Sequence, residues 1–314
     1  MPVNRPTPLQ IDRTGKLCHL ITLDGLTRTT VESILDRARF HRHQEWTQVS
    51  SRPVATALLF CEPSTRTRAS FELAAWRLGY HVTNLVPDHS SLAKSETLSE
   101  TAATLEAMGF SFLVLRHSNP LSAMTLINPL DRPLHCISGG TGQLSHPSQG
   151  LLDLFTVCEH FSDLDALTVA IIGDIRHSRV ARSTFTALRL FGVQDIRLCT
   201  PPGLEPDPGD FPETKLYPLE GALRGVRLVI ALRLQRERMA DTLQPDTSRY
   251  RKNYGLTLER LKLCDPHVRI MHPGPVMPDE ELAGELIDSP YSLVREQVRN
   301  GVPIRMAIFE TLAG

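Results

Sequence analysis

Residues 55–68 read Ala-Thr-Ala-Leu-Leu-Phe-Cys-Glu-Pro-Ser-Thr-Arg-Thr-Arg, an apolar run that leads into a cluster of hydroxyl and guanidinium side chains. The run Ala55–Phe60 has the length of a buried β-strand, and the apolar spacing of Ser70–Leu78 predicts a helix that begins near Arg68. A buried strand that passes directly into a helix is the repeating unit of parallel sheets covered on both faces. This stretch therefore predicts an α/β fold with the polar cluster at the end of a strand.

The same alternation continues along the chain, which at 314 residues has the length of two domains. We expect each domain to be a central parallel β-sheet flanked by helices, with the boundary near the helix after His146, because the alternation restarts at Leu167. Helices are predicted at Thr29–His43, Leu98–Met108, Pro147–His160 and Arg179–Leu190. Further strands are predicted at Phe112–Leu115, Leu134–Ile137, Leu167–Ile172, Ile196–Cys199, Leu228–Leu232 and Val268–Met271.

The charges are balanced, with 34 Lys and Arg against 35 Asp and Glu, which excludes a bulk polycation held to nucleic acid or membrane. A hydrophobic content of 41% excludes a highly charged disordered chain. Arginine outnumbers lysine by 29 to 5, and genome composition explains most of this excess. A few of these arginines are candidates for bidentate binding of carboxylates or phosphates.

The six cysteines form no CxxC pair and have no histidine at zinc spacing, so we expect reduced thiols in a cytoplasmic protein. The first residues contain no apolar leader, and the chain has no run of roughly 18 apolar residues. We therefore expect neither a membrane span nor a nucleic-acid partner. No ligand set for a metal is visible, and the sequence indicates no cofactor.

The cluster after Phe60 has the chemistry of an anion site. The hydroxyls of Ser64, Thr65 and Thr67 and the guanidinium groups of Arg66 and Arg68 meet at a predicted helix N-terminus, where free backbone N–H groups favour a phosphate. The alternative is an ordinary N-cap followed by a solvated basic turn. That alternative explains Ser64 or Thr65 but not the whole cluster.

These residues carry a family resemblance. The Ser-Thr-Arg-Thr-Arg run at 64–68 resembles the carbamoyl-phosphate loop of the aspartate/ornithine carbamoyltransferase family. His146-Pro147-Ser148-Gln149 is similar to the family's HPTQ motif, and Arg116-His117 is similar to its Arg-His after a strand. The match covers most of the N-terminal half in the right order.

The C-terminal half resembles the aspartate-using branch of that family. Residues 233–238, Arg-Leu-Gln-Arg-Glu-Arg, are similar to its RxQxER motif, and 94–97, Lys-Ser-Glu-Thr, to its KGET loop. Residues 272–275, His-Pro-Gly-Pro, match its HPGP motif, where ornithine-using members have His-Cys-Leu-Pro. The resemblance implies transfer of the carbamoyl group of carbamoyl phosphate to the amine of L-aspartate, giving N-carbamoyl-L-aspartate and phosphate, the committed step of de novo pyrimidine (UMP) biosynthesis.

The resemblance also implies the domain limits and the site. Residues 1–147, completed by a C-terminal helix at about 298–314 that returns to them, would bind carbamoyl phosphate, and residues 148–297 would bind aspartate. The catalytic residues would be Arg66, Thr67, Lys94, Arg116 and His146. The carbamoyl-phosphate ligands would be Ser64, Thr65, Arg66, Thr67, Arg116, His146, Gln149, Pro273 and Gly274, and the aspartate ligands would be Lys94, Arg179, Arg233 and Gln235.

Assembly and alternatives follow from the same resemblance. In this family the loop of Ser91 and Lys94 enters the active site of a neighbouring subunit, which implies a homotrimer with shared active sites. The sequence leaves open a regulatory chain or a dihydroorotase-like partner. It also leaves two alternative functions: an ornithine-type transcarbamoylase, and a catalytically weak paralogue that serves as a scaffold subunit.

The sequence departs from the family in three places. Met277 and Pro278 replace the polar Asn-Arg after HPGP in many members, which puts aspartate affinity in doubt, and Pro278 removes a backbone donor. Thr141 stands where an Asp is usual, and Ser95 replaces the Gly after the loop lysine. The acidic run 279–281 could suggest a metal site, but we expect a solvated acidic helix start.

Overall fold

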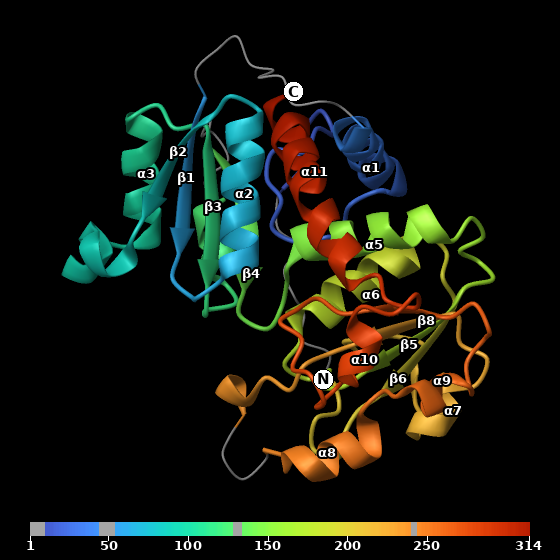
Figure 1. The fold of residues 1–314 in the computed structure, drawn as a ribbon. Coiled ribbons are helices and arrows are strands. Elements are labelled where there is room, and N and C mark those ends of the chain that lie inside the picture. The colour runs from blue at the N-terminus through green and yellow to red at the C-terminus, as the bar shows by residue number, and fades with distance from the viewer. Residues whose placement is uncertain (1–9, 44–53, 128–133, 240–243) are drawn as a thin grey trace. The chain divides into compact units, whose positions relative to one another are not determined.

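The computed structural model describes residues 10–43, 54–127, 134–239 and 244–314. They form two compact units, of which one extends to Phe155 and includes Val298–Gly314, whereas the other is Thr156–Gln297 (Figure 1). Helices α5 (Pro147–His160) and α11 (Val294–Ala313) each begin in one unit and end in the other. Each unit contains a parallel sheet with flanking helices, so the predicted α/β class is confirmed.

The first unit contains a four-stranded sheet of order β2-β1-β3-β4. All three strand pairs are parallel, and Thr56 of β1 is in register with Val82 of β2 and with Phe112 of β3. A parallel pair requires a crossover between its strands, and helices supply these crossovers. The strands are β1 (Ala55–Phe60), β2 (His81–Leu85), β3 (Phe112–His117) and β4 (His135–Thr141).

Side chains of this sheet alternate between two packed faces. Ala57 and Leu59 of β1 join a core with α3 (Leu98–Ala107) and α4 (Ser122–Leu126). The opposite face packs against α2 (Thr65–Arg77) and α11 (Figure 1). There the ring of Phe309 lies 5.0 Å from that of Phe112 and 5.8 Å from that of Phe71, between centroids.

The C-terminal helix α11 also contacts the first helix of the chain, α1 (Arg28–His43). His41 Nε2 lies 2.8 Å from Glu310 Oε2, and the buried histidine ring leaves this pair little contact with water. The last helix therefore supplies side chains to the core of the first unit. This confirms the predicted return of the C-terminal helix to the N-terminal domain.

The second unit contains a five-stranded parallel sheet of order β7-β6-β5-β8-β9. Its central strands are almost wholly apolar, as expected for strands covered on both faces. One face packs on α7, α9 and α10, and α6 lies on the other (Figure 1). The strands are β5 (Thr168–Ile172), β6 (Asp195–Cys199), β7 (Lys215–Leu216), β8 (Leu228–Ala231) and β9 (Arg269–Met271), and the helices are α6 (Arg179–Leu190), α7 (Leu219–Leu223), α8 (Thr247–Tyr254), α9 (Leu258–Leu261) and α10 (Gly284–Ile287).

The helix predicted to begin near Arg68 begins instead at Thr65. Ser64 is its N-cap, with an extended backbone at φ −163°. Thr65, Arg66 and Thr67 therefore lie in the first helical turn, whereas the apolar spacing of the sequence becomes visible only one turn later. The correction matters because first-turn N–H groups have no partner inside the helix.

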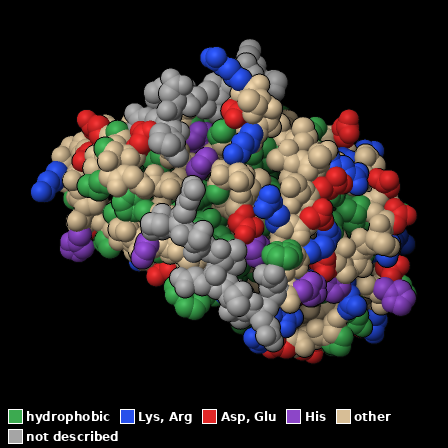
Figure 2. All heavy atoms as spheres, turned by 90° about the horizontal axis from the view of Figure 1, so that it is seen from above, with side chains coloured by type: hydrophobic (Ala, Val, Ile, Leu, Met, Phe, Trp, Pro, Cys, Tyr) green, Lys and Arg blue, Asp and Glu red, His purple; other side chains and the backbone are tan. Residues whose placement is uncertain are grey.

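The surface agrees with the balanced charge. On the face of the described residues that Figure 2 shows, Lys and Arg side chains are interspersed with Asp and Glu side chains. None of the helices in the described ranges combines the length and the apolar character needed to cross a bilayer.

Candidate active site

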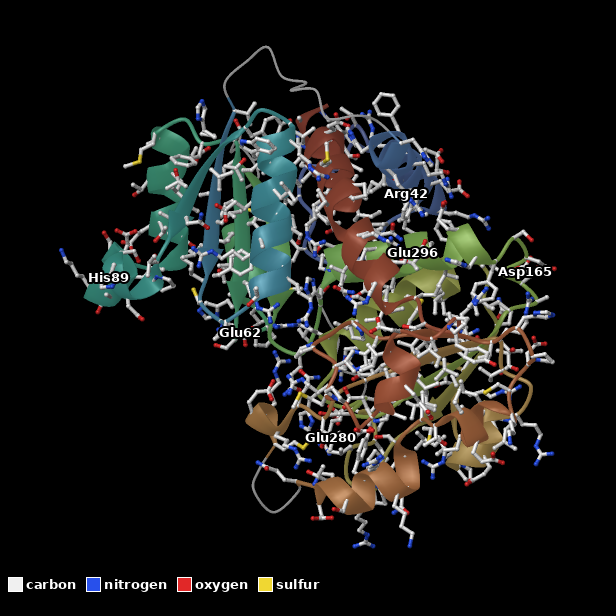
Figure 3. The ribbon with its side chains drawn as sticks, viewed as in Figure 1. Arg42, Glu62, His89, Asp165, Glu280 and Glu296 are labelled. Carbon is white, nitrogen blue, oxygen red and sulfur yellow. The ribbon has the colours of Figure 1, made fainter. Side chains whose placement is uncertain are left out.

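The predicted residues of the first unit follow the carboxyl ends of neighbouring strands. Residues 64–67 follow β1, Arg116 lies at the end of β3, and His146 and Gln149 follow β4. Because β1, β3 and β4 are adjacent and parallel, their carboxyl ends lie along one edge of the sheet. Glu62 marks this edge at the end of β1 (Figure 3).

The N-terminus of α2 presents an uncapped first turn. The Ser64 side chain makes no capping hydrogen bond to the helix, so the hydroxyl and the first backbone N–H groups remain available to a ligand. Thr67 is buried, and its Oγ1 lies 3.4 Å from His146 Nε2. Thr65 and Arg66 are exposed. Within the described ranges, the Arg66 guanidinium forms no hydrogen bond or ion pair.

Arg68, the second arginine of the cluster, is engaged elsewhere. Its Nε donates a 3.0 Å hydrogen bond to Oδ1 of Asn84 on β2, the edge strand. Arg66 and Arg68 thus differ in a way that their sequence positions did not indicate: one is free to bind an anion, and the other supports β2.

The contacts of Arg116 include a hydrogen bond and an ion pair. Its Nη1 donates to the carbonyl oxygen of Gly139 at 3.1 Å, and its Nε lies 3.6 Å from Glu62 Oε2. Both charged side chains are largely buried, which strengthens their attraction. The guanidinium is therefore fixed at the sheet edge, close to the connection between β1 and α2.

His146 and Gln149 lie at the start of α5. His146 is buried, with Nδ1 3.5 Å from Ser148 Oγ and Nε2 facing Thr67. Gln149 Nε2 donates a 2.9 Å hydrogen bond to Oδ1 of Asp153, a fully buried carboxylate one turn later. Thr67 therefore lies next to His146, and the Gln149 side chain is held by the carboxylate of Asp153.

Cys61 directly precedes this site but is not a candidate nucleophile. Burial raises the pKa of the Cys61 thiol, and the carboxylates of Glu62 and Asp88 raise it further. A thiol with a raised pKa stays protonated at neutral pH, and the thiolate is the reactive form.

Ser91 and Lys94 lie in the short 3₁₀ helix η2 (Ser91–Lys94), in which no residue is buried. No hydrogen bond or ion pair joins either side chain to the other predicted site residues within the described ranges. Ser95 ends η2 at φ 71° and ψ 17°, the left-handed conformation that glycine adopts most easily. This conformation costs a residue with a Cβ about 1 kcal/mol, which explains the family's glycine there.

The predicted residues of the second unit also follow neighbouring strands. Arg179 begins α6 after β5, Arg233 and Gln235 follow β8, and the Pro273-Gly274 pair follows β9. Asp174, fully buried after β5, ties two of these loops together. Its Oδ2 accepts a 3.1 Å hydrogen bond from the backbone of Gln235, and its Oδ1 lies 2.9 Å from His177 Nδ1.

Arg233 is oriented by its neighbour Glu237. The guanidinium makes two contacts with this carboxylate, Nη1 to Oε2 at 3.0 Å and Nη2 to Oε1 at 2.5 Å. This pairing raises the pKa of Arg233 and lowers that of Glu237, so both stay charged. Arg238 continues the loop and donates from Nη1 to the carbonyl oxygen of His177 at 3.1 Å.

The acidic run 279–281 was predicted to be a solvated helix start, and this prediction is wrong. Glu280 and Glu281 are only 8% and 2% exposed, and α10 begins later. Glu281 Oε1 lies 2.9 Å from His272 Nε2 and accepts a 2.7 Å hydrogen bond from the backbone of Met277. His272 Nδ1 in turn accepts from the backbone N–H of Gly274 at 2.9 Å. The residues that depart from the family thus form a turn built around a buried carboxylate.

Sequence reasoning missed three buried carboxylates that hold site residues or their direct neighbours: Asp153, Asp174 and Glu281. Asp153 lies four residues after Gln149 on α5, a helical spacing that could have indicated the contact. Asp174 and Glu281 act across loops, and no spacing reveals such contacts. In the part of the chain that the structure describes, no group of three or more His, Cys, Asp or Glu side chains is arranged to hold a metal ion.

Known proteins resemble this chain over nearly its whole length. The family model for the aspartate/ornithine carbamoyltransferase carbamoyl-P binding domain matches residues 18–159, and the model for the Asp/Orn binding domain matches residues 165–312. A protein from Xanthomonas euvesicatoria pv. vesicatoria named aspartate carbamoyltransferase catalytic subunit is 43% identical over 314 residues, covering 98% of this chain and 100% of that protein. A protein of the same name from Stenotrophomonas maltophilia is 42% identical, with the same coverage.

Solved structures of carbamoyltransferases also match the fold of this chain. The aspartate transcarbamoylase of Trypanosoma cruzi in complex with aspartate and phosphate matches with a TM-score of 0.80 and 26% identity, covering 95% of this chain and 96% of that one. The ornithine carbamoyltransferase of Thermus thermophilus also matches with a TM-score of 0.80, at 25% identity, covering 94% of this chain and 99% of that one.

Proposed function

Because the chain belongs to the aspartate/ornithine carbamoyltransferase family, we propose that it transfers the carbamoyl group of carbamoyl phosphate to L-aspartate. The products are N-carbamoyl-L-aspartate and phosphate, in the committed step of de novo pyrimidine biosynthesis. The observation that carries the proposal is the alignment of residues 64–67, Arg116 and His146 along one sheet edge. The relatives at 42–43% identity are named for aspartate, which favours aspartate over ornithine.

The phosphate group binds at the N-terminus of α2. The hydroxyls of Ser64, Thr65 and Thr67, the uncapped first-turn N–H groups and the Arg66 guanidinium supply hydrogen bonds and positive charge. The helix dipole adds to this attraction because its positive end faces the anion.

The carbonyl oxygen of the carbamoyl group receives donors from Thr67, Arg116 and His146. Negative charge builds on this oxygen when the amine attacks, and donors fixed in advance stabilise that charge without reorganising. The contacts that hold Arg116 to Gly139 and Glu62, and the 3.4 Å approach of Thr67 to His146, provide this fixed geometry. Gln149 and the backbone of Pro273 and Gly274 hold the carbamoyl NH₂.

Aspartate brings two carboxylates, which we assign to Arg179, to Arg233 with Gln235, and to Lys94. Planar guanidinium groups bind carboxylates bidentately, as Arg233 already binds Glu237. No covalent intermediate is needed, since the departing phosphate takes the proton of the attacking amine. Catalysis then rests on orientation and electrostatics.

The proposed binding domain for carbamoyl phosphate is residues 1–147 together with about 298–314. The proposed binding domain for aspartate is residues 148–297.

We further propose a homotrimer in which Ser91 and Lys94 serve the active site of a neighbouring subunit. Trp76 and Leu73 on α2 are 67% and 37% exposed, one turn apart beside the edge strand β2, and such apolar exposure suits an interface. Light scattering is expected to give three times the 35.0 kDa chain mass. Trp76→Glu is expected to give monomers with little activity, because Lys94 acts in another subunit. A fully active monomer would contradict the proposal.

A cytoplasmic location is proposed from the thiols. All six cysteines are free, as expected in a reducing compartment. Cell fractionation with a thiol-alkylating label on intact cells would test this, and labelling from outside the membrane would contradict it.

The function itself is tested by incubating the purified protein with carbamoyl phosphate and either L-aspartate or L-ornithine. We expect N-carbamoyl-L-aspartate and phosphate in equal amounts, and little citrulline. Turnover of ornithine alone would favour the ornithine-type alternative. Binding of carbamoyl phosphate without turnover of either amine would favour the scaffold alternative.

A further inference from the structure

We propose that Asp153 is a positioning residue that fixes which end of the Gln149 amide faces the carbamoyl group, so that the site selects an acyl phosphate bearing an NH₂ group. The inference deepens the proposed function and rests on it. It assigns a role in substrate discrimination to a side chain that does not itself contact substrate.

The hydrogen-bonding capacity of the two side chains determines the amide orientation. Gln149 offers one acceptor oxygen and one donor nitrogen, whereas an ionised carboxylate only accepts. Asp153 Oδ1 therefore requires the NH₂ end, and Gln149 Nε2 lies 2.9 Å from it. Oε1 of Gln149 must then point the other way. This assignment rests on chemistry, because amide oxygen and nitrogen are otherwise hard to distinguish.

The orientation matches the substrate. The carbamoyl NH₂ can donate hydrogen bonds, and the outward Oε1 of Gln149 can accept one. Gln149 is only 8% exposed, and its Oε1 accepts no hydrogen bond from another described residue. If the amide were reversed, two NH₂ groups would face each other in a nearly dry place, and each would lose a partner.

Asp153 needs a compensating charge, because it is fully buried and a lone buried carboxylate would become protonated. Arg305 on α11, itself only 2% exposed, is a positive charge close enough for Asp153 to raise its pKa, so it compensates the carboxylate. Its Nη1 donates to the carbonyl oxygen of Gly301 at 2.7 Å, and its guanidinium carbon lies 4.9 Å from the centroid of the Phe71 ring. Burial lowers the pKa of Arg305 to about 9, and the Asp153 charge opposes this shift, so Arg305 stays cationic at neutral pH.

The alternative is a purely structural role, in which Asp153 only stabilises α5. A Gln–Asp pair four residues apart on a helix contributes about 0.2–0.5 kcal/mol. A purely structural role predicts equal weakening of every ligand of the site. A positioning role predicts a selective loss for ligands that present an NH₂ group, and this difference decides the experiment.

The test compares three probes on the Asp153→Asn variant: carbamoyl phosphate, acetyl phosphate, which has a methyl in place of the NH₂, and inorganic phosphate. Asn can present either end to Gln149, so the amide orientation is no longer fixed. We expect the KM for carbamoyl phosphate to rise about 10-fold or more, as for a buried polar group left unpaired. Inhibition by acetyl phosphate and by phosphate is expected to change less than about twofold. Glu159→Gln, on the exposed end of α5, is the control, with all three values unchanged.

Asp153→Asn leaves Arg305 uncompensated and could fail to fold, so Asp153→Asn/Arg305→Met is made in parallel to remove both charges together. The same selective loss is expected in the double variant. Unchanged discrimination between carbamoyl and acetyl phosphate in a folded variant would overturn the inference, as would equal weakening of all three probes. A wild-type protein that forms no carbamoyl-aspartate would instead overturn the proposed function.

Discussion

Arg66→Ala is expected to lower kcat/KM for carbamoyl phosphate by about 100- to 1000-fold while leaving the melting temperature unchanged. The loss corresponds to removing one preorganised charged donor from the transition state. The stability should not change because Arg66 is exposed in the first turn of α2, and its guanidinium forms no hydrogen bond or ion pair within the described ranges. Alanine also suits a helical position.

Arg68→Ala is the matched control, since it removes the same group two residues later in the same helix. Its guanidinium donates to Asn84 and so supports β2 rather than the anion site. We expect kcat/KM within about threefold of wild type, consistent with the small energy of an exposed hydrogen bond. Steady-state kinetics at fixed aspartate measures both variants. If Arg66→Ala and Arg68→Ala lower kcat/KM equally, the assignment of Arg66 to the phosphate is wrong.

The second large effect is on acid stability, through His19. We expect the free energy of unfolding of the first unit to fall by about 3 kcal/mol between pH 6.5 and pH 4. Burial, and then the neighbouring His135, lower the pKa of His19 from 6.5 to about 4. Between pH 6.5 and pH 4, His19 therefore binds a proton in the unfolded chain but stays largely neutral in the folded chain. The contribution is complete above pH 6.5 and is lost as the pH falls towards 4.

His19→Asn separates this effect from general acid denaturation. His19 Nδ1 accepts a 3.1 Å hydrogen bond from the backbone of Cys136, and the Asn oxygen can replace it without titrating. Urea unfolding followed by the fluorescence of Trp76, which lies in the same unit, should show most of the pH dependence removed. His43→Asn, at an exposed position of α1, should leave it intact. The explanation fails if His19→Asn keeps the full acid sensitivity.

The sequence predicted the buried elements of the fold well. The bounds of β1, α5 and α6 match the structure, because each combines a clear apolar period with a defined start and stop. The edge strands β2 and β7 were missed, since partial burial leaves no apolar run to detect. The start of α2 was misplaced by three residues, because its first turn is polar and faces the proposed ligand.

The candidate site divides in the same way. The residues proposed to face the substrates lie in short contiguous motifs, such as residues 64–67 and 146–149, and the sequence alone was enough to propose them. The carboxylates Asp174 and Glu281 could not, because each acts on residues that chain folding alone brings close. Glu281 even sits in a run that looks solvent-exposed in the sequence. Burial of an acidic side chain is a property of tertiary structure, and no local pattern encodes it.

The return of α11 to the first unit has a consequence for protein synthesis. The N-terminal half emerges from the ribosome long before the last codons are read. Phe309, near the end of the chain, nevertheless packs against Phe71 and Phe112 in the core of that half. The residues between, Thr156–Gln297, are all present earlier and carry their own core. The half that is made first is thus completed last. A premature stop codon near the end of the gene would remove part of the core of the unit proposed to bind carbamoyl phosphate, not a dispensable tail.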